Sequence, residues 1–142
     1  MTEYEQREDL HGEEHVRRYR ETDGREGYRW KRGSEILLLT TLGRRSGEER
    51  THALIFREVD GARVIVASKG GHAQHPAWYL NMREQELVDV QVKGDRYKAR
   101  HRDAEGPERE RLWKLMTEVW PDYDSYQQRT DRQIPVVVLE RA

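Results

Sequence analysis

Two pairs of strand-forming segments, each joined by a tight turn, limit this chain to a small antiparallel fold. The segments THALIFRE and RVIVAS flank an Asp-Gly pair at 60–61, and LVDVQV and RYKARH flank a Lys-Gly-Asp turn at 93–95. Such turn residues between alternating segments predict β-hairpins. The apolar runs ILLLTT at 36–41 and IPVVVLE at 134–140 predict one further strand each. No strand–helix–strand rhythm supports a doubly wound sheet.

Two prolines mark the starts of helices between these strands. Pro76 suits the first turn of a short helix through PAWYLNMRE. Pro107 precedes ERERLWKLMTEVW, in which apolar residues recur at helical spacing from Leu112 to Val119. The sequence therefore predicts a mainly β fold with some helix (α+β), an antiparallel barrel decorated by short helices.

The length fits one domain, and its N-terminal part is the least suited to the core. The chain has 142 residues, of which 37% are charged and 35% hydrophobic, so some of it should lie outside the core. Residues 1–25 carry dense charge of both signs and few apolar residues, among them Leu10, Val16 and Tyr19. We expect at best a solvated helix there, with disorder before about His11, and the barrel domain at 26–142.

Composition excludes several classes of function. The formal net charge of −1, from 26 basic and 27 acidic residues, provides no global field for nucleic acid or anionic lipid. The chain has no cysteine, which excludes disulfides and thiolate catalysis and favours a cytosolic location, and no apolar run is long enough to cross a bilayer. His72 and His75 have no third ligand at suitable spacing, so no metal is expected. No GxSxG motif indicates a serine hydrolase.

The segment GRRSGEER at 43–50 joins two predicted strands and is rich in arginine. Arg44, Arg45 and Arg50 with the small residues around Ser46 would suit a phosphate or carboxylate. A solvated turn explains the same pattern and is favoured when the segment is taken alone.

The segment ASKGG at 67–71 follows a valine-rich strand. It would place backbone donors, the Ser68 hydroxyl and the Lys69 ammonium at a barrel rim, where a polar ring or a phosphate could bind. An ordinary flexible loop is the alternative. Two loops that could each bind an anion, beside neighbouring strands, favour a phosphate-binding site more strongly than either loop alone.

Aromatic residues follow in two places, and their roles stay open at this level. Trp78, on the first turn of the predicted helix, could wall a ring-binding cleft or fill the core, and the two are weighed equally. Trp120, Tyr123 and Tyr126 are spaced by three and would share one face of a helical segment. They could line an acceptor pocket or pack onto the barrel.

Three motifs, taken in order, carry a resemblance to a known family. LLLTTLGRRSGEER, VIVASKGGHAQHPAWYLNM and VWPDYDSYQQRTDRQIPVVVLE resemble the deazaflavin-dependent nitroreductase family, whose members include quinone reductases that use coenzyme F-420. The similarity runs from about Trp30 to Glu140. It implies a split β-barrel of the flavin-reductase type and a hydride transfer from reduced deazaflavin to a quinone-like or nitroaromatic acceptor.

The resemblance also implies a role for each motif. The basic segment would hold the phosphate and oligoglutamate tail, while ASKGG and the following helix start would surround the coenzyme. The implied coenzyme-binding residues are Arg44, Arg45, Ser46, Arg50, Ala67, Ser68, Lys69, Gly70, Gly71, Pro76, Ala77 and Trp78. The implied acceptor-pocket residues are Ile55, Trp120, Tyr123 and Tyr126. We expect Ser68 or Tyr126 to polarise the acceptor oxygen.

The chain departs from the family pattern at three of these positions. His52-Ala53 stands where a proline commonly follows the basic segment, Ile55 where an aromatic can occur, and Trp120 in place of a tyrosine. These changes bear on nitroaromatic reduction more than on coenzyme binding. The family's membrane-associating N-terminal helix is not recognisable in residues 1–20, so peripheral membrane contact is not supported by the sequence.

Three alternatives share the predicted barrel. It could bind flavin mononucleotide (FMN) in place of the deazaflavin, or hold a coenzyme without turning it over. It could also be a non-enzymatic module that presents arginines and aromatics to single-stranded nucleic acid, against which the neutral net charge argues. The oligomeric state is left open.

Overall fold

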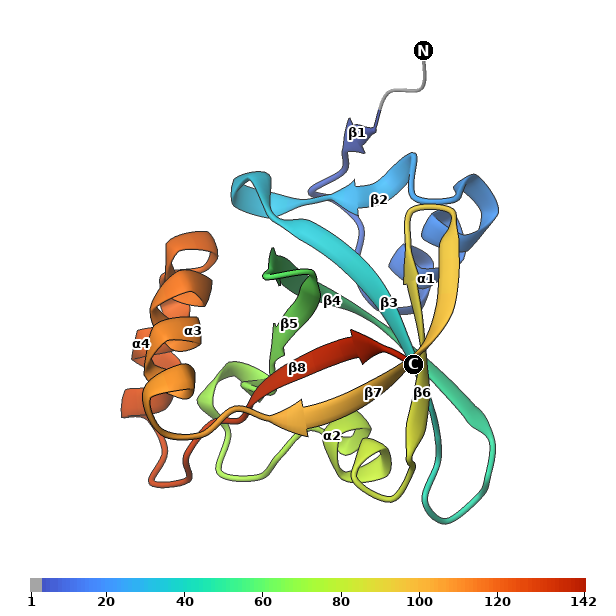
Figure 1. Cartoon of the computed structure of the whole chain (residues 1–142). Helices are drawn as coiled ribbons and strands as arrows, with labels where there is room; N and C mark the ends of the chain where they lie inside the picture. Colours follow the sequence, from blue (N-terminus) through green and yellow to red (C-terminus); the bar gives the residue numbers. More distant parts are fainter. Residues whose placement is uncertain (1–3) are drawn as a thin grey trace.

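A closed antiparallel barrel forms the centre of the computed structural model, which describes residues 4–142 (Figure 1). Neighbouring strands follow the order β3-β4-β5-β8-β7-β6, and β3 also pairs with β6, which closes the barrel. The strands are β3 (Glu35–Leu42), β4 (Glu49–Val59), β5 (Ala62–Val66), β6 (Leu87–Val92), β7 (Asp95–Asp103) and β8 (Val136–Arg141). The predicted barrel is confirmed.

Both predicted hairpins are present, and the second turn consists of Lys93 and Gly94 alone, because Asp95 already pairs with Val92. Val59 pairs with Ala62 across Asp60 and Gly61, whose φ angles are 52° and 84°. Positive φ at both central residues matches the right-handed twist of the strands, and an Asp-Gly pair adopts it readily. Turn chemistry in the sequence therefore determined this part of the topology.

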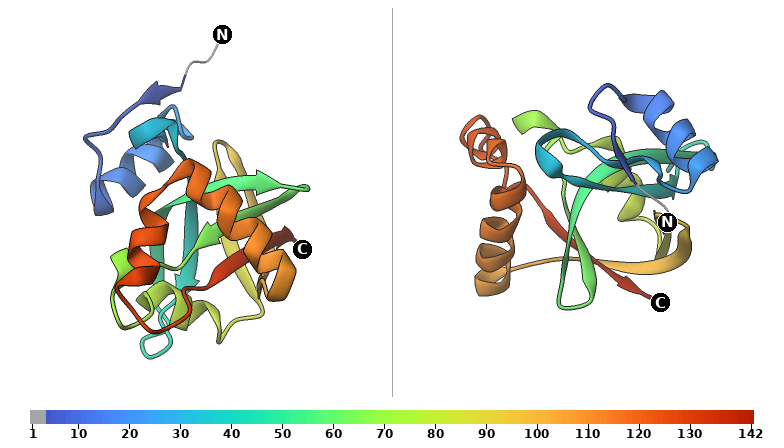
Figure 2. Two further views of the ribbon diagram at one scale, coloured as in Figure 1. Left: turned by 90° about the vertical axis from the view of Figure 1, so that its left-hand side faces the viewer. Right: turned by 90° about the horizontal axis from the view of Figure 1, so that it is seen from above.

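Among residues 4–142, four α-helices decorate the barrel, and the last two along the chain cover one side of it (Figure 2). They are α1 (Gly12–Thr22), α2 (Ala77–Met82), α3 (Gly106–Val119) and α4 (Asp122–Gln128). The helices α2 and α3 begin where Pro76 and Pro107 predicted them. In the described part of the chain, no helix is long and apolar enough to cross a membrane.

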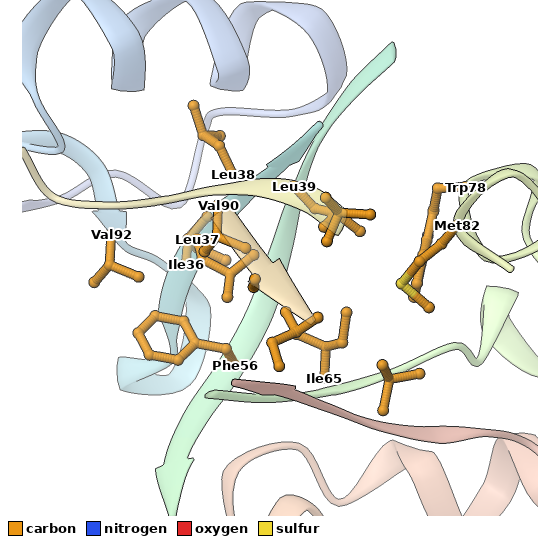
Figure 3. Packing of buried hydrophobic residues seen from close by; sticks show 14 of the residues in the cluster. Ile36, Leu37, Leu38, Leu39, Phe56, Ile65, Trp78, Met82, Val90 and Val92 are labelled. Atoms are coloured by element: carbon orange, nitrogen blue, oxygen red, sulfur yellow. The ribbon is translucent and has the colours of Figure 1, made fainter. Parts of the chain in front are cut away.

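The core has two parts that follow the two faces of the strands. Inside the barrel, residues such as Leu37, Leu39 and Ile65 pack together (Figure 3). On the outer face of β5 and β8, Val64 and Val136 contact the apolar face of α3 and α4. Alternation along β5 thus feeds both clusters, because successive side chains of a strand point to opposite faces.

The N-terminal segment is part of the folded body, which corrects the expectation of a solvated helix. Tyr19 on α1 is 0% exposed. Its hydroxyl donates to Ile36 O (2.9 Å) and accepts from Lys93 N (2.7 Å). Few apolar residues suffice here because a buried tyrosine brings a large apolar ring and satisfies its polar end.

The chain before α1 also contacts the body, through the short parallel pair of β1 (Glu5–Gln6) and β2 (Glu26–Arg29). Leu10 is 2% exposed. Disorder was expected before about His11, and residues 4–10 contradict it; residues 1–3 lie outside the described residues.

Candidate functional site

A large cleft runs along an incompletely paired edge of β4. Residues 49–56 of β4 pair with β3, whereas only 57–59 pair with β5. The edge that β5 leaves uncovered forms one wall of a cleft of about 750 Å³, here called the main cleft. Consecutive residues 49–55 line it, so both faces of the strand contribute. This volume lies within the range of small-molecule and cofactor sites.

The three aromatic residues predicted to share a face converge on the main cleft. They do not share one helix, since α3 ends at Val119 and Trp120 precedes α4. Tyr123 is buried in the outer core, which raises its pKa above the ordinary value, while Trp120 and Tyr126 are half-buried. The Trp120 indole N–H donates to Tyr126 Oη at 3.4 Å. All three residues therefore line the cleft, and Tyr123 is in addition a buried part of the outer core.

Trp30 stacks on Trp120 and was not anticipated by the sequence. The ring centroids lie 5.8 Å apart with an interplanar angle of 11°. The Trp30 indole donates to Leu10 O (3.0 Å), and the Arg32 guanidinium lies 4.3 Å from the centroid of the Trp120 ring. Residues 11–13, 15 and 16 line the same side of the cleft. The N-terminal segment thus covers part of the site. In the sequence, only the position of Trp30 at the start of the family resemblance could have indicated this.

The ASKGG segment forms a rim of the main cleft. Ser68 and Gly70 line the main cleft, and Lys69–Gly71 make a single 3-10 turn. Gly71 has φ +81° and packs so closely on α4 that a Cβ there would lie 2.5 Å from Tyr126 O. The glycine therefore joins the rim to the aromatic wall and fixes their separation.

Arg132 binds the backbone of this rim, and the sequence analysis did not predict this role. Its guanidinium donates to the carbonyl oxygens of Ala67 (3.2 Å), Ser68 (2.6 Å) and His72 (2.8 Å). A fourth contact, 3.0 Å long, runs to Nδ1 of His75. Burial, then the charge of Arg132, lowers the pKa of His75. A neutral His75 accepts this hydrogen bond, so the cluster carries one positive charge.

The basic turn between β3 and β4 leads into the main cleft at Arg50, while its other two arginines lie outside the lining. Arg50 lines the cleft and pairs with Glu48 at 3.4 Å. Arg44 is tied to α2, because its backbone N and its Nη1 both donate to Asn81 Oδ1 (3.1 and 2.8 Å). Arg45 and Ser46 are exposed, and Ser46 Oγ accepts from Glu48 N. The turn is internally braced, and it leaves the side chain of Arg45 in solvent.

The residues at the start of α2 serve mainly the fold. Trp78 is 6% exposed and packs in the barrel core beside Met82 (Figure 3). Pro76 is buried and Ala77 exposed, and neither they nor Trp78, Ala67 or Lys69 belong to the cleft lining. The side chain of Trp78 therefore packs in the core, and its contact with the coenzyme stays a prediction.

Comparison with known proteins adds the family. The model described as F420H(2)-dependent quinone reductase matches residues 11–141. The F420H(2)-dependent quinone reductase Rv1261c of Mycobacterium tuberculosis is 39% identical over 126 residues, which are 87% of this chain and 85% of that protein.

Solved structures agree with the sequence relatives. A structure of an F420-H2-dependent reductase superposes with a TM-score of 0.67 at 43% identity, covering 74% of this chain and 93% of that one. A chain described as a domain-swapped dimer gives a TM-score of 0.70 at 39% identity, covering 88% and 96%. HutZ from Vibrio cholerae, at 13% identity and a TM-score of 0.61 over 94% and 92%, shows the fold alone.

The match extends over most of the chain and agrees with the barrel, so the resemblance read from the three motifs is confirmed. The chain belongs to the F420H(2)-dependent quinone reductase family.

Proposed function

We propose that the main cleft binds reduced coenzyme F-420 and that the protein passes its hydride to a quinone-like acceptor. One observation carries this proposal: a single cleft connects the basic turn at Arg50 with Ser68 and Tyr126. A coenzyme with an anionic tail and a flat ring needs a basic group near its tail and polar and aromatic groups around its ring. The names of the relatives support the same coenzyme and acceptor class.

The residues present fit the coenzyme. Arg50 and the solvent-exposed Arg45 offer guanidinium groups to the phosphate and the acidic tail. Ser68 and Gly70 border the position of the ring, and His52 has a buried ring nitrogen without a partner among the described residues. Arg44 and Ser46 would brace the turn, Lys69 would add a charge at the rim, and Ala67 and Gly71 would set its shape.

When bound, the coenzyme supplies a hydride and the protein supplies positioning and hydrogen bonds. Reduction of a quinone to a hydroquinone needs this hydride and one proton. Tyr126 Oη already accepts a hydrogen bond from Trp120, so its own O–H proton is free for the acceptor oxygen. The Ser68 hydroxyl belongs to the rim of the same cleft. Ile55 and Trp120 would limit access of water and shape the acceptor pocket.

Removing both hydroxyls should slow turnover without loss of coenzyme binding. For a Ser68→Ala/Tyr126→Phe double variant we expect kcat with menadione to fall about 100-fold, because proton donation in the transition state is lost, while the Kd of coenzyme F-420 changes little. Tyr97→Phe is the control, since it removes a hydroxyl that lies outside the main cleft. Full turnover in the double variant would refute the assignment.

Three finer points stay predictions. They are the reduction of nitroaromatic compounds, a cytosolic location, and a division of the chain near residue 25. FMN is the alternative coenzyme that the fold also admits.

A further inference from the structure

A line of three aromatic side chains leads from the N-terminal segment to the Tyr126 hydroxyl. Trp30 stacks on Trp120, and Trp120 donates from its indole N–H to Tyr126 Oη at 3.4 Å. All three residues line the main cleft. At the other end of the line, the Trp30 indole donates to Leu10 O at 3.0 Å. A hydroxyl in the cleft is therefore connected, contact by contact, to a segment far earlier in the chain.

The ring of Trp120 needs this support because its backbone belongs to neither neighbouring helix. The helix α3 ends at Val119, and the φ and ψ of Trp120, −139° and 86°, are not helical. Besides Trp30, the guanidinium of Arg32 lies over its ring, 4.3 Å from the centroid. Arg32 also pairs with Asp122 at 3.2 Å. The turn after β2 thus contacts the junction of α3 and α4 through both of its side chains.

The backbone of this turn is strained at Arg32. Its φ of 59° and ψ of 24° lie in the left-handed region, which a residue with a side chain rarely adopts. Such strain persists where surrounding contacts determine the conformation, and it is concentrated at functional sites. The contacts of the Arg32 guanidinium with Trp120 and Asp122 are of this kind. The strain therefore indicates a turn that is shaped to support Trp120.

The hydroxyl of Tyr126 depends on Trp120 for its orientation. Close packing against Gly71 fixes the backbone of Tyr126, whereas the indole of Trp120 is the one hydrogen-bond partner of Tyr126 Oη among the described residues. A phenol that accepts a hydrogen bond is a stronger donor, because hydrogen bonds in a chain polarise one another. If the Trp120 ring turned away, the Tyr126 hydroxyl would lose both this polarisation and its fixed direction.

We propose that Trp30 is a positioning residue for the reaction: it holds the ring of Trp120 in the orientation from which the indole N–H reaches Tyr126. This inference rests on the proposed function. In the step that it supports, a quinone gains the hydride of the coenzyme and the proton of Tyr126 and becomes a hydroquinone, and solvent returns a proton to the phenolate. The N-terminal segment then contributes to turnover and not to coenzyme affinity.

The test measures a single turnover, so that product release does not mask the chemical step. Protein loaded with reduced coenzyme F-420 is mixed with excess menadione, and the fluorescence of the oxidised coenzyme is followed. For Trp30→Leu, which keeps apolar bulk without a flat ring, we expect a rate constant about tenfold lower and a coenzyme Kd within about twofold of wild type. Trp30→Phe keeps a ring for the stack and should retain at least about half of the wild-type rate.

Combination with Tyr126→Phe separates positioning from a structural role. Tyr126→Phe should slow the step about tenfold, and adding Trp30→Leu should change nothing further, because the hydroxyl on which Trp30 acts is gone. A merely structural role predicts that the two losses multiply to roughly 100-fold. Arg32→Gln changes an exposed side chain and so leaves the fold intact. It should slow the step about threefold, and not at all beside Tyr126→Phe.

Trp113→Leu is the matched control. Trp113 packs on the same aromatic cluster, with its ring centroid 6.2 Å from that of Tyr123, but it is not part of the cleft lining. Its indole donates to Asp124 Oδ1 at 2.7 Å. This variant should melt at a lower temperature than wild type, because packing is lost, and should keep the wild-type rate and coenzyme Kd.

The outcomes separate this inference from the proposed function. If wild type binds and oxidises the coenzyme and Trp30→Leu reacts equally fast, the positioning role is wrong and the proposed function stands. A full rate in Tyr126→Phe, losses that multiply, or an equal loss in Trp113→Leu also contradict the positioning role. If wild type does not bind the coenzyme, the proposed function fails, and the positioning role with it.

Discussion

Replacing Gly71 by alanine is expected to lower the free energy of unfolding by roughly 3 kcal/mol or more. The backbone there has φ +81°, which an L side chain rarely adopts, and the new Cβ would lie 2.5 Å from Tyr126 O and 2.8 Å from Tyr126 Cα. Neither atom can move without shifting α4. We expect the rim to separate from the aromatic wall, so the affinity for coenzyme F-420 should fall as well. Urea denaturation followed by circular dichroism measures the loss of stability.

Gly70→Ala is the matched control for this experiment. Its φ of +61° is also unfavourable for alanine, but a Cβ there has no atom within 4 Å. Only backbone strain remains, which costs about 1 kcal/mol. If the two alanine variants lose equal stability, the close approach of Gly71 to Tyr126 does not exist in solution.

Arg132→Met should destabilise the protein by about 3 kcal/mol and weaken coenzyme binding by at least tenfold. Methionine keeps much of the apolar stem but removes every donor to the carbonyl oxygens of Ala67, Ser68 and His72. The hydrogen bonds to Ala67 O and Ser68 O are partly buried, and an acceptor left unpaired in such a place costs more than an average hydrogen bond contributes. Thermal denaturation and fluorescence titration with the coenzyme check the two parts.

Arg129→Met provides the comparison. Arg129 belongs to the same segment but is exposed, and its one contact to the rim is a 3.4 Å hydrogen bond to Gly70 O. Its loss should cost less than 1 kcal/mol and leave coenzyme affinity nearly unchanged. Equal effects at both positions would show that positive charge near the rim, and not the multiple contacts of Arg132, supports the site.

The parts of the fold that were predictable are those in which local chemistry determines the result. The Asp-Gly turn at 60–61 specified a hairpin, and Pro107 specified the start of α3. The packing of α1 was not predictable, because its charged sequence gives little sign that Tyr19 would reach backbone groups of β3 and of the turn after β6. Long-range contacts of this kind leave no periodic signal in one sequence.

In the site, too, local spacing was predictable and long-range contacts were not. The spacing of Trp120, Tyr123 and Tyr126 indicated a shared location, and the structure brings them to one cleft, although across the break between α3 and α4. Arg132 could not be singled out in a chain with 26 basic residues, since its role depends on where the rim carbonyls point. The uncovered edge of β4 was equally hidden, because strand patterns do not show how far two strands stay paired.

The most direct measurement of the central claim is a fluorescence titration of the protein with oxidised coenzyme F-420, beside the same titration with FMN. The account predicts saturable binding of the deazaflavin, weaker binding of FMN, and a roughly tenfold loss of affinity in Arg45→Ala and in Lys69→Ala. Arg100→Ala, which removes an exposed arginine paired with Glu86, should bind as wild type does. Tight FMN binding without deazaflavin binding would leave the barrel intact and contradict the coenzyme assignment.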